Sequence, residues 1–211
     1  MPDEIIFHHS PMSRGRVVHW MLEEAGCRYR HALLDFETGE HKRAEYLAVN
    51  PMGKVPAIVH KGVVVTETPA ILAYLADEFP AAGLAPAIHD PRRGSYLRWM
   101  FFSHGCLEVA IVDRMLGRAA PERTGALGYG SYETTMATIE QALATGPYLL
   151  GEQFSAADIQ VGSALGWGLM MKAVEPRPAF LAYLERGRAR PAFARFNAQS
   201  AALLEGMKAA G

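Results

Sequence analysis

The chain has 211 residues, half of them apolar, which is enough to bury a core in one domain or in two small ones. The formal net charge is -1, the sequence pI is about 6.7 and no block of lysine or arginine occurs, so neither nucleic acid nor a membrane surface is an expected partner. Two cysteines are too few for a disulfide framework, no apolar run approaches the roughly 18 residues of a membrane span, and the acidic start does not resemble a signal peptide, so we expect a soluble, cytoplasmic protein.

The first eighty residues alternate between strand and helix patterns. A helix with apolar residues on one face follows the first strand, and Gly26 stands where that helix should end. Two later strands flank Lys61 and Gly62, which is a hairpin signal. This order of elements predicts an α/β layer whose first two strands pair in parallel. The expected strands are 4–9, 29–36, 57–60 and 63–66, and the expected helices are 14–25, 41–49 and 69–79.

Strand patterns stop after this region. The stretch around Gly83, rich in proline and alanine, is expected to be a linker, and apolar spacing beyond it predicts only helices. We therefore expect an α/β domain at 1–80, a linker at 81–90 and an all-helical domain at 91–211. The expected helices of the second domain are 91–118, 131–145, 156–171, 178–188 and 192–206.

A proline stands where the third strand should begin, in NPMGKVPAI at 50–58. Proline has no amide hydrogen and is excluded from the middle of a sheet. A cis Val55–Pro56 bond would turn the chain and leave the backbone groups of Val55 free to pair with an extended ligand. A trans proline at a sheet edge explains the same residues, because only roughly 5–6% of X–Pro bonds are cis.

The stretch TETPAI at 66–71 has the pattern of a helix start. We expect Thr68 at the N-cap and Pro69 as the first helical residue. The exposed amides and the positive end of the helix dipole favour a bound carboxylate, and Glu67 beside them could hold an ammonium group. A carboxylate next to an ammonium is the head of an amino acid, although an ordinary helix cap explains these residues without a ligand.

The loop HHSPMSRGR at 8–16 joins the first strand to the first helix. Ser10 in this loop could donate a hydrogen bond to a thiolate and lower the pKa of that thiol from about 8.5. Equally, Ser10 and Pro11 could simply begin the helix. Three basic residues elsewhere are candidates for a second carboxylate or are solvated surface groups: His41, Lys42 and Lys54.

Together these stretches resemble the cytosolic glutathione transferases. The matching segments are SPMSRGRVVHWMLEEAG, GEHKRAEYLAVNPMGKVPAI, TETPAILAYLADEFP and FSAADI, in the order and spacing of the family. The resemblance covers nearly the whole chain, with weak motifs in residues 90–145, and it is nearest to the serine-type classes theta and phi. It implies a thioredoxin-like N-terminal domain, an all-helical C-terminal domain and glutathione as co-substrate.

The resemblance also implies how glutathione is held. The backbone beside a cis proline would pair with the cysteinyl part, the start of the third helix would hold the γ-glutamyl head, and basic side chains would hold the glycine carboxylate. These residues are, in that order, Val55 and Pro56; Glu67 and Thr68; and His41 and Lys54, with Lys42 as a weaker candidate.

In serine-type members one hydroxyl of the first loop carries catalysis. Ser10 matches that place best, because S-P-x-S-R resembles the theta pattern S-x-x-C-R, and Ser13 is the rival hydroxyl if the loop alignment slips. His8 and His9 stand where tyrosine-type members carry tyrosine, and the loop has no cysteine, so neither of those modes is expected. The loop also lacks the Ser-Ser-Cys of the zeta class, which makes maleylacetoacetate isomerisation a less expected activity.

Two further features have plain structural explanations. In FSAADI, Ser155 and Asp158 form a capping box, with Phe154 and Ile159 as its hydrophobic staple. His8 and His9 are adjacent on a strand and must point to opposite faces, and no metal-binding motif occurs, so we expect no metal.

The most apolar helical stretch is 99–112. In the family the acceptor pocket borrows residues from this helix, whereas periodicity alone makes the stretch part of the core or of a dimer contact. The candidate pocket residues are Trp99, Phe102 and Cys106, of which Cys106, like Cys27, is otherwise an inert packing residue.

The leading expectation is a homodimeric detoxification enzyme that activates the glutathione thiol and conjugates it to a hydrophobic electrophile. A second possibility keeps glutathione but changes the reaction to an isomerase, a dehalogenase or a peroxidase. A third is a non-catalytic relative that serves as an interaction module; an intact set of Ser10, Pro56, Glu67 and Thr68 argues against it. The sequence does not identify the electrophile.

Overall fold

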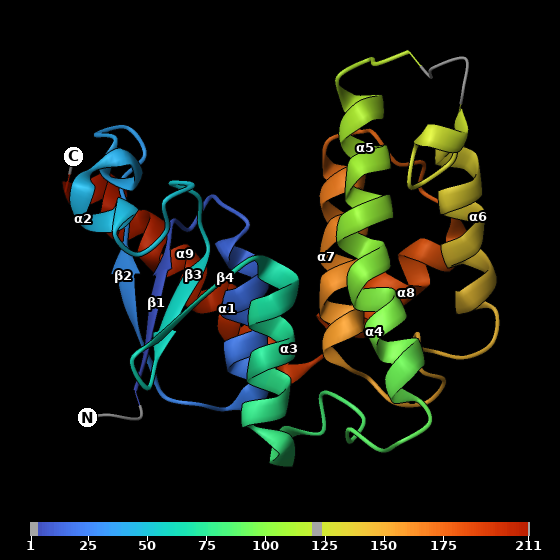
Figure 1. Ribbon diagram of the computed structural model, residues 1–211, viewed down its shortest axis with the longest axis horizontal. Helices are drawn as coiled ribbons and strands as arrows, with labels where there is room; N and C mark the ends of the chain where they lie inside the picture. The colour runs from blue at the N-terminus through green and yellow to red at the C-terminus, as the bar shows by residue number, and fades with distance from the viewer. Residues whose placement is uncertain (1–3, 120–123, 211) are drawn as a thin grey trace. The chain divides into compact units, whose positions relative to one another are not determined.

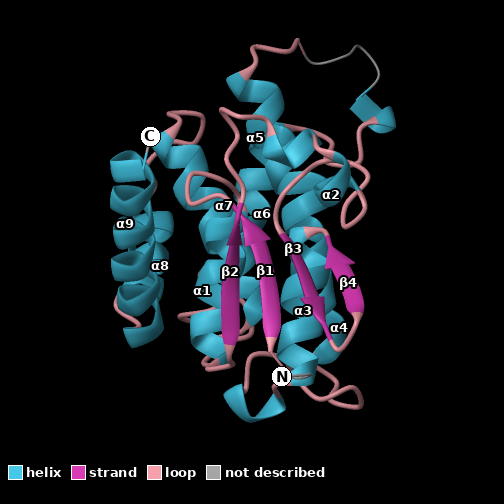
Figure 2. Cartoon of the chain, turned by 90° about the vertical axis from the view of Figure 1, so that its left-hand side faces the viewer, coloured by secondary structure: helices cyan, strands magenta, loops and turns pink. Residues whose placement is uncertain are grey.

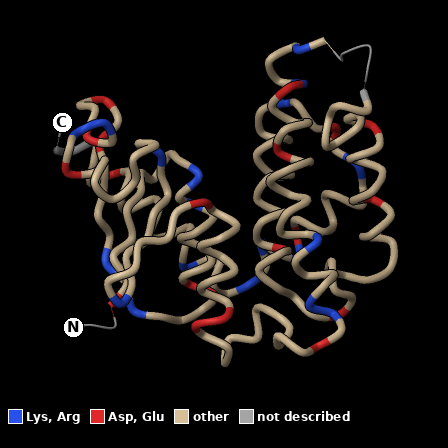
Figure 3. The backbone as a smooth tube through the Cα atoms, viewed as in Figure 1, with Lys and Arg blue, Asp and Glu red and all other residues tan. Residues whose placement is uncertain are grey.

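The computed structural model describes residues 4–119 and 124–210, which fall into two compact units (Figure 1). The first unit is built from the described residues up to 82 together with the segment that begins at 191, and the second is built from residues 83–190. Basic and acidic positions are scattered over both units, with no block of either sign (Figure 3). No helix of the described residues is long and apolar enough to cross a membrane.

A four-stranded mixed sheet forms the centre of the first unit (Figure 2). Its order is β2-β1-β3-β4; β1 and β2 are parallel, as expected, and the other pairs are antiparallel. Lys61 and Gly62 both have positive φ, 52° and 77°, which makes the two-residue hairpin expected there. The strands are β1 (Ile5–His9), β2 (Tyr29–Leu33), β3 (Ala57–His60) and β4 (Val63–Thr66).

Helices α1 (Gly15–Ala25) and α3 (Thr68–Glu78) lie behind the sheet in Figure 2 and bury their apolar faces. Gly26 ends α1 in the left-handed conformation with φ 63°, as the sequence predicts. This arrangement of sheet and helices confirms the thioredoxin-like fold of the first unit.

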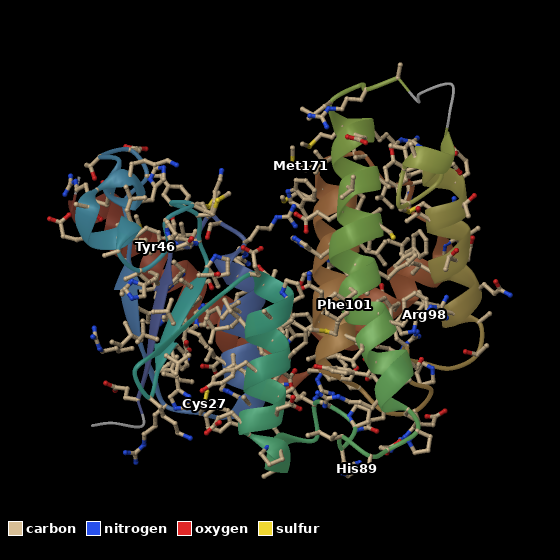
Figure 4. The ribbon with its side chains drawn as sticks, viewed as in Figure 1. Cys27, Tyr46, His89, Arg98, Phe101 and Met171 are labelled. Atoms are coloured by element: carbon tan, nitrogen blue, oxygen red, sulfur yellow. The ribbon has the colours of Figure 1, made fainter. Side chains whose placement is uncertain are left out.

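The helix expected at 41–49 is two shorter pieces. A 3-10 turn, η1 (Glu40–Lys42), is followed by α2 (Ala44–Leu47), because Arg43 between them is extended, with ψ 155°. Tyr46 is the buried residue of α2, and its ring centroid lies 5.7 Å from that of His8 on β1 (Figure 4).

The last helix, α9 (Pro191–Ala210), belongs to the first unit and packs along α1. The Trp20 ring meets Phe193 edge to face, and Arg195 Nε donates to Glu23 Oε2 at 2.8 Å. The division drawn from the sequence grouped these residues with the helical domain instead.

The second unit is entirely helical in its described part. The helix expected at 91–118 is α4 and α5 joined by a π-helical turn at Ser103–Leu107, a feature the sequence did not predict. Gly83 to Pro91 contains no regular element, while residues 80–82 form a 3-10 turn. The helices are α4 (Arg93–Phe102), α5 (Glu108–Met115), α6 (Tyr132–Leu143), α7 (Ala156–Met170) and α8 (Pro178–Arg188), with a 3-10 turn at Thr124–Ala126.

The start of α7 confirms the expected capping box. Asp158 accepts the Ser155 amide at 2.8 Å, the Leu149 amide at 2.9 Å and the Tyr183 hydroxyl at 3.0 Å. Phe154 and Ile159 are both buried, as a hydrophobic staple requires. Asp158 therefore joins the loop before α7 to α8.

Candidate functional site

The sheet register gathers three of the predicted segments at one end of the first unit. His8 of β1 pairs with Ala57 of β3, so the register continued by two residues brings Ser10 opposite Val55. Ala57 also pairs with Thr66 of β4, which brings Pro56 opposite Glu67. In Figure 2 this is the end to which β1 and β4 point and from which β3 departs. Residues far apart in sequence are thus neighbours at one end of the strands.

The turn before β3 is held by polar contacts that the sequence analysis missed. Lys54 O accepts the Tyr46 hydroxyl at 2.5 Å and the Asn50 side-chain amide at 2.8 Å. Asn50 also accepts the Met52 amide through Oδ1 at 3.1 Å and the Gly53 amide through its carbonyl at 2.8 Å. Asparagine before proline signals such a turn, because its short side chain bonds to the backbone two residues on. The backbone leading into Val55 is therefore fixed on its N-terminal side.

The Val55–Pro56 peptide bond is cis. Within residues 4–119 and 124–210, neither the amide nor the carbonyl of Val55 takes part in a hydrogen bond. Pro56 is buried and Val55 is half-buried. The chain therefore offers an amide and a carbonyl with no protein partner directly before a strand.

Two basic residues lie against this turn. A Cβ on Gly53, whose φ is 59°, would stand 2.8 Å from the His41 carbonyl and 3.0 Å from Lys42 Nζ, so η1 packs directly on the turn. His41 Nδ1 is buried and finds no hydrogen-bond partner among the described residues, which is unusual for a ring nitrogen. Lys54, at the end of the turn, is exposed.

The start of α3 differs by one residue from the prediction. Glu67 occupies the N-cap, Thr68 is the first helical residue and Pro69 is the second. Glu67 has φ 66° and ψ 116°, a backbone conformation that non-glycine residues rarely adopt. Such outliers cluster at ligand-binding positions.

The loop between β1 and α1 treats its two serines differently. Ser13 Oγ donates to Ser10 O at 2.6 Å and accepts the Gly15 amide at 3.0 Å, so its hydroxyl is hydrogen-bonded to the backbone on both sides. Ser10 is 5% exposed, and its hydroxyl forms no hydrogen bond within the described chain. Because α1 begins at Gly15, Ser10 and Pro11 do not start the helix.

The two histidines before Ser10 both have lowered pKa values. Burial and the nearby His31 and His19 lower the pKa of His9 to about 3, while burial and Arg30 lower the pKa of His8. The two rings point to opposite faces of β1, as expected. No group of three or more potential ligands among the described residues is arranged to hold a metal ion.

The three acceptor-pocket candidates lie in the second unit. Trp99 is 3% exposed, meets Phe102 edge to face at 5.4 Å and has the Arg98 guanidinium 4.5 Å from its ring centre (Figure 4). Phe102 and Cys106 are half-buried. Cys106 belongs to the π-helical turn, and its Sγ donates to Gly128 O at 3.6 Å. Trp99 is thus a packed core residue, and the other two retain exposed surface.

Comparison with known proteins agrees with this arrangement. The family model for the glutathione S-transferase N-terminal domain matches residues 4–77, and the model for the C-terminal domain matches residues 110–186. Among curated relatives, the disulfide-bond oxidoreductase YfcG of Escherichia coli K12 is 30% identical over 200 residues, covering 89% of this chain and 92% of that protein. The glutathione S-transferase hmp2 of Hypomyces subiculosus is 26% identical over 166 residues, covering 74% of this chain and 78% of that protein.

Solved structures give the same result. A glutathione transferase from Methylococcus capsulatus superposes with a TM-score of 0.77 at 32% identity, covering 93% of this chain and 98% of that one. A glutathione transferase homologue from Sulfitobacter, solved with bound glutathione, gives 0.75 at 28% identity, covering 94% and 99%. The chain belongs to the glutathione S-transferase family.

Proposed function

We propose that this protein is a glutathione transferase that binds the tripeptide at the end of the strands, at Ser10, Val55 and Glu67, and uses its thiolate as a nucleophile. The observation that carries the proposal is the sheet register, which brings a hydroxyl, an unpaired peptide group and a helix start to one place. Each part suits one portion of γ-Glu-Cys-Gly.

The binding roles follow from chemistry at each position. The unpaired amide and carbonyl of Val55, beside Pro56, would pair with the cysteinyl backbone as an added strand does. Glu67 would accept the ammonium of the γ-glutamyl head, and the amides at Thr68 would take its carboxylate. At the other end, three basic side chains gather around the turn and would hold the glycine carboxylate: His41, Lys42 and Lys54.

Ser10 is the proposed catalytic residue. Its hydroxyl has no partner among the described residues and is available to donate to the sulfur, whereas the Ser13 proton is already donated to the Ser10 carbonyl. A hydrogen bond to a charged group is worth about 1.5–3 kcal/mol, or about one to two pKa units. From a free thiol near 8.5, that shift makes the thiolate a major species near neutral pH.

The reaction is a nucleophilic attack. The glutathione thiol loses its proton to solvent, and the thiolate forms a C–S bond to an electrophilic carbon as a leaving group departs. Phe102 and Cys106 remain proposed acceptor-pocket residues, since both keep exposed surface. Trp99 is buried and contacts the Phe102 ring, so its proposed role is to hold Phe102 in place. We further propose that the protein is a cytoplasmic homodimer without a metal cofactor.

A second candidate function keeps the same thiolate. Similarity to a disulfide-bond oxidoreductase over 200 residues favours attack on sulfur, in which the thiolate forms a mixed disulfide and expels another thiolate. Isomerase, dehalogenase and peroxidase chemistry on the same site stay as alternatives. Tight glutathione binding would separate all of these from a non-catalytic interaction module.

Calorimetric titration with glutathione and with S-methylglutathione tests the proposal. Glu67→Gln should weaken binding of both ligands by about 10-fold or more, because a charge-assisted hydrogen bond to the ammonium is lost. The matched control Glu45→Gln, at an exposed position on α2, should bind as the wild type does. Absence of glutathione binding, or equal affinity in all three proteins, would refute the proposed site.

A further inference from the structure

Three histidines meet inside the first unit, one each from β1, α1 and β2. His9 and His19 are each 1% exposed. His9 Nε2 lies 2.8 Å from His31 Nδ1, and the rings of His31 and His19 stand edge to face with centroids 5.0 Å apart. The His9 and His19 centroids are also only 5.9 Å apart, so the three rings form one compact cluster between β1, β2 and α1, which we call the imidazole row.

One end of this row is held by α9. His19 Nε2 lies 2.9 Å from Gln199 Oε1, and Gln199 Nε2 donates to the Glu23 carboxylate at 3.1 Å, so the amide oxygen must accept from His19. His19 Nε2 therefore carries the proton. Nδ1 is left as an acceptor, and the Ser200 hydroxyl, 3.1 Å away, donates to it. Both ring nitrogens of neutral His19 are therefore hydrogen-bonded to residues of α9, namely Ser200 and Gln199.

The other end of the row reaches the candidate thiol site. His9 directly precedes Ser10, so the two residues share a peptide bond, and both are buried, at 1% and 5% exposure. The α1 helix also starts against this residue, because a Cβ on Gly15 would stand 2.7 Å from His9 Cβ. A shift of the His9 ring therefore displaces the backbone of Ser10 or the start of α1.

We propose that the imidazole row positions Ser10: it transmits the seating of α9 to the loop that carries the hydroxyl, so that a helix contributing no residue to the proposed glutathione site sets how well the thiolate is stabilised. This inference rests on the proposed function of Ser10. Ser200 and Gln199 act through His19, and are positioning residues rather than catalytic ones.

The charged surroundings favour a neutral row. Burial lowers the pKa of all three imidazoles. Among the described residues, Glu23 is the acidic group that acts on His19 and His31, and it already accepts from Tyr29, Arg195 and Gln199. The ionisable groups facing the row are Arg16 and Glu23 from α1, Tyr29 from β2 and Arg195 from α9, while His8 lies on the opposite face of β1.

The test is the ultraviolet absorbance of the bound glutathione thiolate against pH, measured together with the Kd of glutathione. Ser200→Ala, a mild change on α9, should lower the acid dissociation constant of the bound thiol about 2- to 30-fold while the Kd stays within about twofold. Gln199→Ala should act in the same direction. The matched control Glu205→Gln, at an exposed position of α9, should leave the titration unchanged.

A double mutant separates this inference from the function on which it rests. In a Ser10→Ala background, Ser200→Ala should have no further effect on the titration, because its influence passes through Ser10. If Ser200 is purely structural, Ser200→Ala will lower the unfolding temperature and leave the pKa of the bound thiol unchanged. That result would contradict the proposed role of the imidazole row but not the proposed function. If Ser10→Ala itself leaves the titration unchanged, the proposed function and this inference both fall.

Discussion

At the scale of single residues, the roles of similar side chains are separated by whether their polar atoms already have partners. The sequence offers two hydroxyls three positions apart, and nothing in the residue types distinguishes them. The folded loop does, because the Ser13 hydroxyl donates to Ser10 O and accepts from the Gly15 amide. Such loop contacts depend on where the helix begins, which sequence patterns locate only to within a residue or two.

Two glycines at helix starts should respond oppositely to alanine. Gly15→Ala places a Cβ 2.7 Å from His9 Cβ and 3.0 Å from Ser13 Oγ, so it should destabilise the fold by about 1–3 kcal/mol. Gly94→Ala on α4 meets nothing within 4 Å and should stabilise by about 0.4–1 kcal/mol. Urea unfolding measures both. Equal effects of the two substitutions would contradict the close approach of α1 to β1.

Asp158→Ala should be among the most damaging single substitutions in the second unit. It leaves the buried amides of Leu149 and Ser155 and the Tyr183 hydroxyl without an acceptor, at a cost of about 3 kcal/mol or more. Glu152→Ala, at a nearby exposed carboxylate, should change the free energy of unfolding by less than about 0.5 kcal/mol. Chemical denaturation of both variants is the measurement; a small loss for Asp158→Ala would contradict the network.

At the scale of elements, the strands, their parallel start and the Gly26 cap followed from periodicity and turn residues. The breaks did not. The interruption at Arg43 and the π-helical turn at Ser103–Leu107 lie within continuous helical patterns, so apolar spacing alone does not locate them. The imidazole row could not be predicted either, since its three histidines come from β1, α1 and β2, and only the fold brings them together.

The row makes stability depend on pH. In the unfolded chain a histidine titrates near 6.5, whereas in the fold the pKa of His9 is about 3 and those of His19 and His31 are also lowered. The unfolded state therefore binds more protons below about pH 6.5, so this contribution to stability is full above that pH and is lost on acidification. We expect the free energy of unfolding to fall by about 2 kcal/mol between pH 7 and 5 from His9 alone.

Urea unfolding at several pH values checks this dependence. His9→Asn should make the free energy of unfolding less dependent on pH, because one of the residues that gain a proton on unfolding is gone. His89→Asn, at an exposed loop position, should keep the wild-type profile (Figure 4). Stability independent of pH over this range would show that the imidazoles are not held neutral by burial.

At the scale of the whole molecule, the chain returns at its end to the unit where it began. The sequence predicts a helix at 192–206 but not its partner, because the contacts of α9 with α1 join residues about 180 positions apart. Phe196 is 3% exposed, with its ring centroid 5.3 Å from that of His19. The candidate glutathione site could be assembled from sequence only through family resemblance, since no local pattern shows that Ser10, Val55 and Glu67 are neighbours.

The central claim is that the Ser10 hydroxyl makes the bound glutathione sulfur anionic. The most direct measurement is the ultraviolet titration of bound glutathione in the wild type, Ser10→Ala and Ser13→Ala. We predict a bound thiol pKa well below about 8.5 in the wild type and in Ser13→Ala, and a rise by about one to two units in Ser10→Ala. Thiolate forming at the same pH in all three proteins would contradict the account.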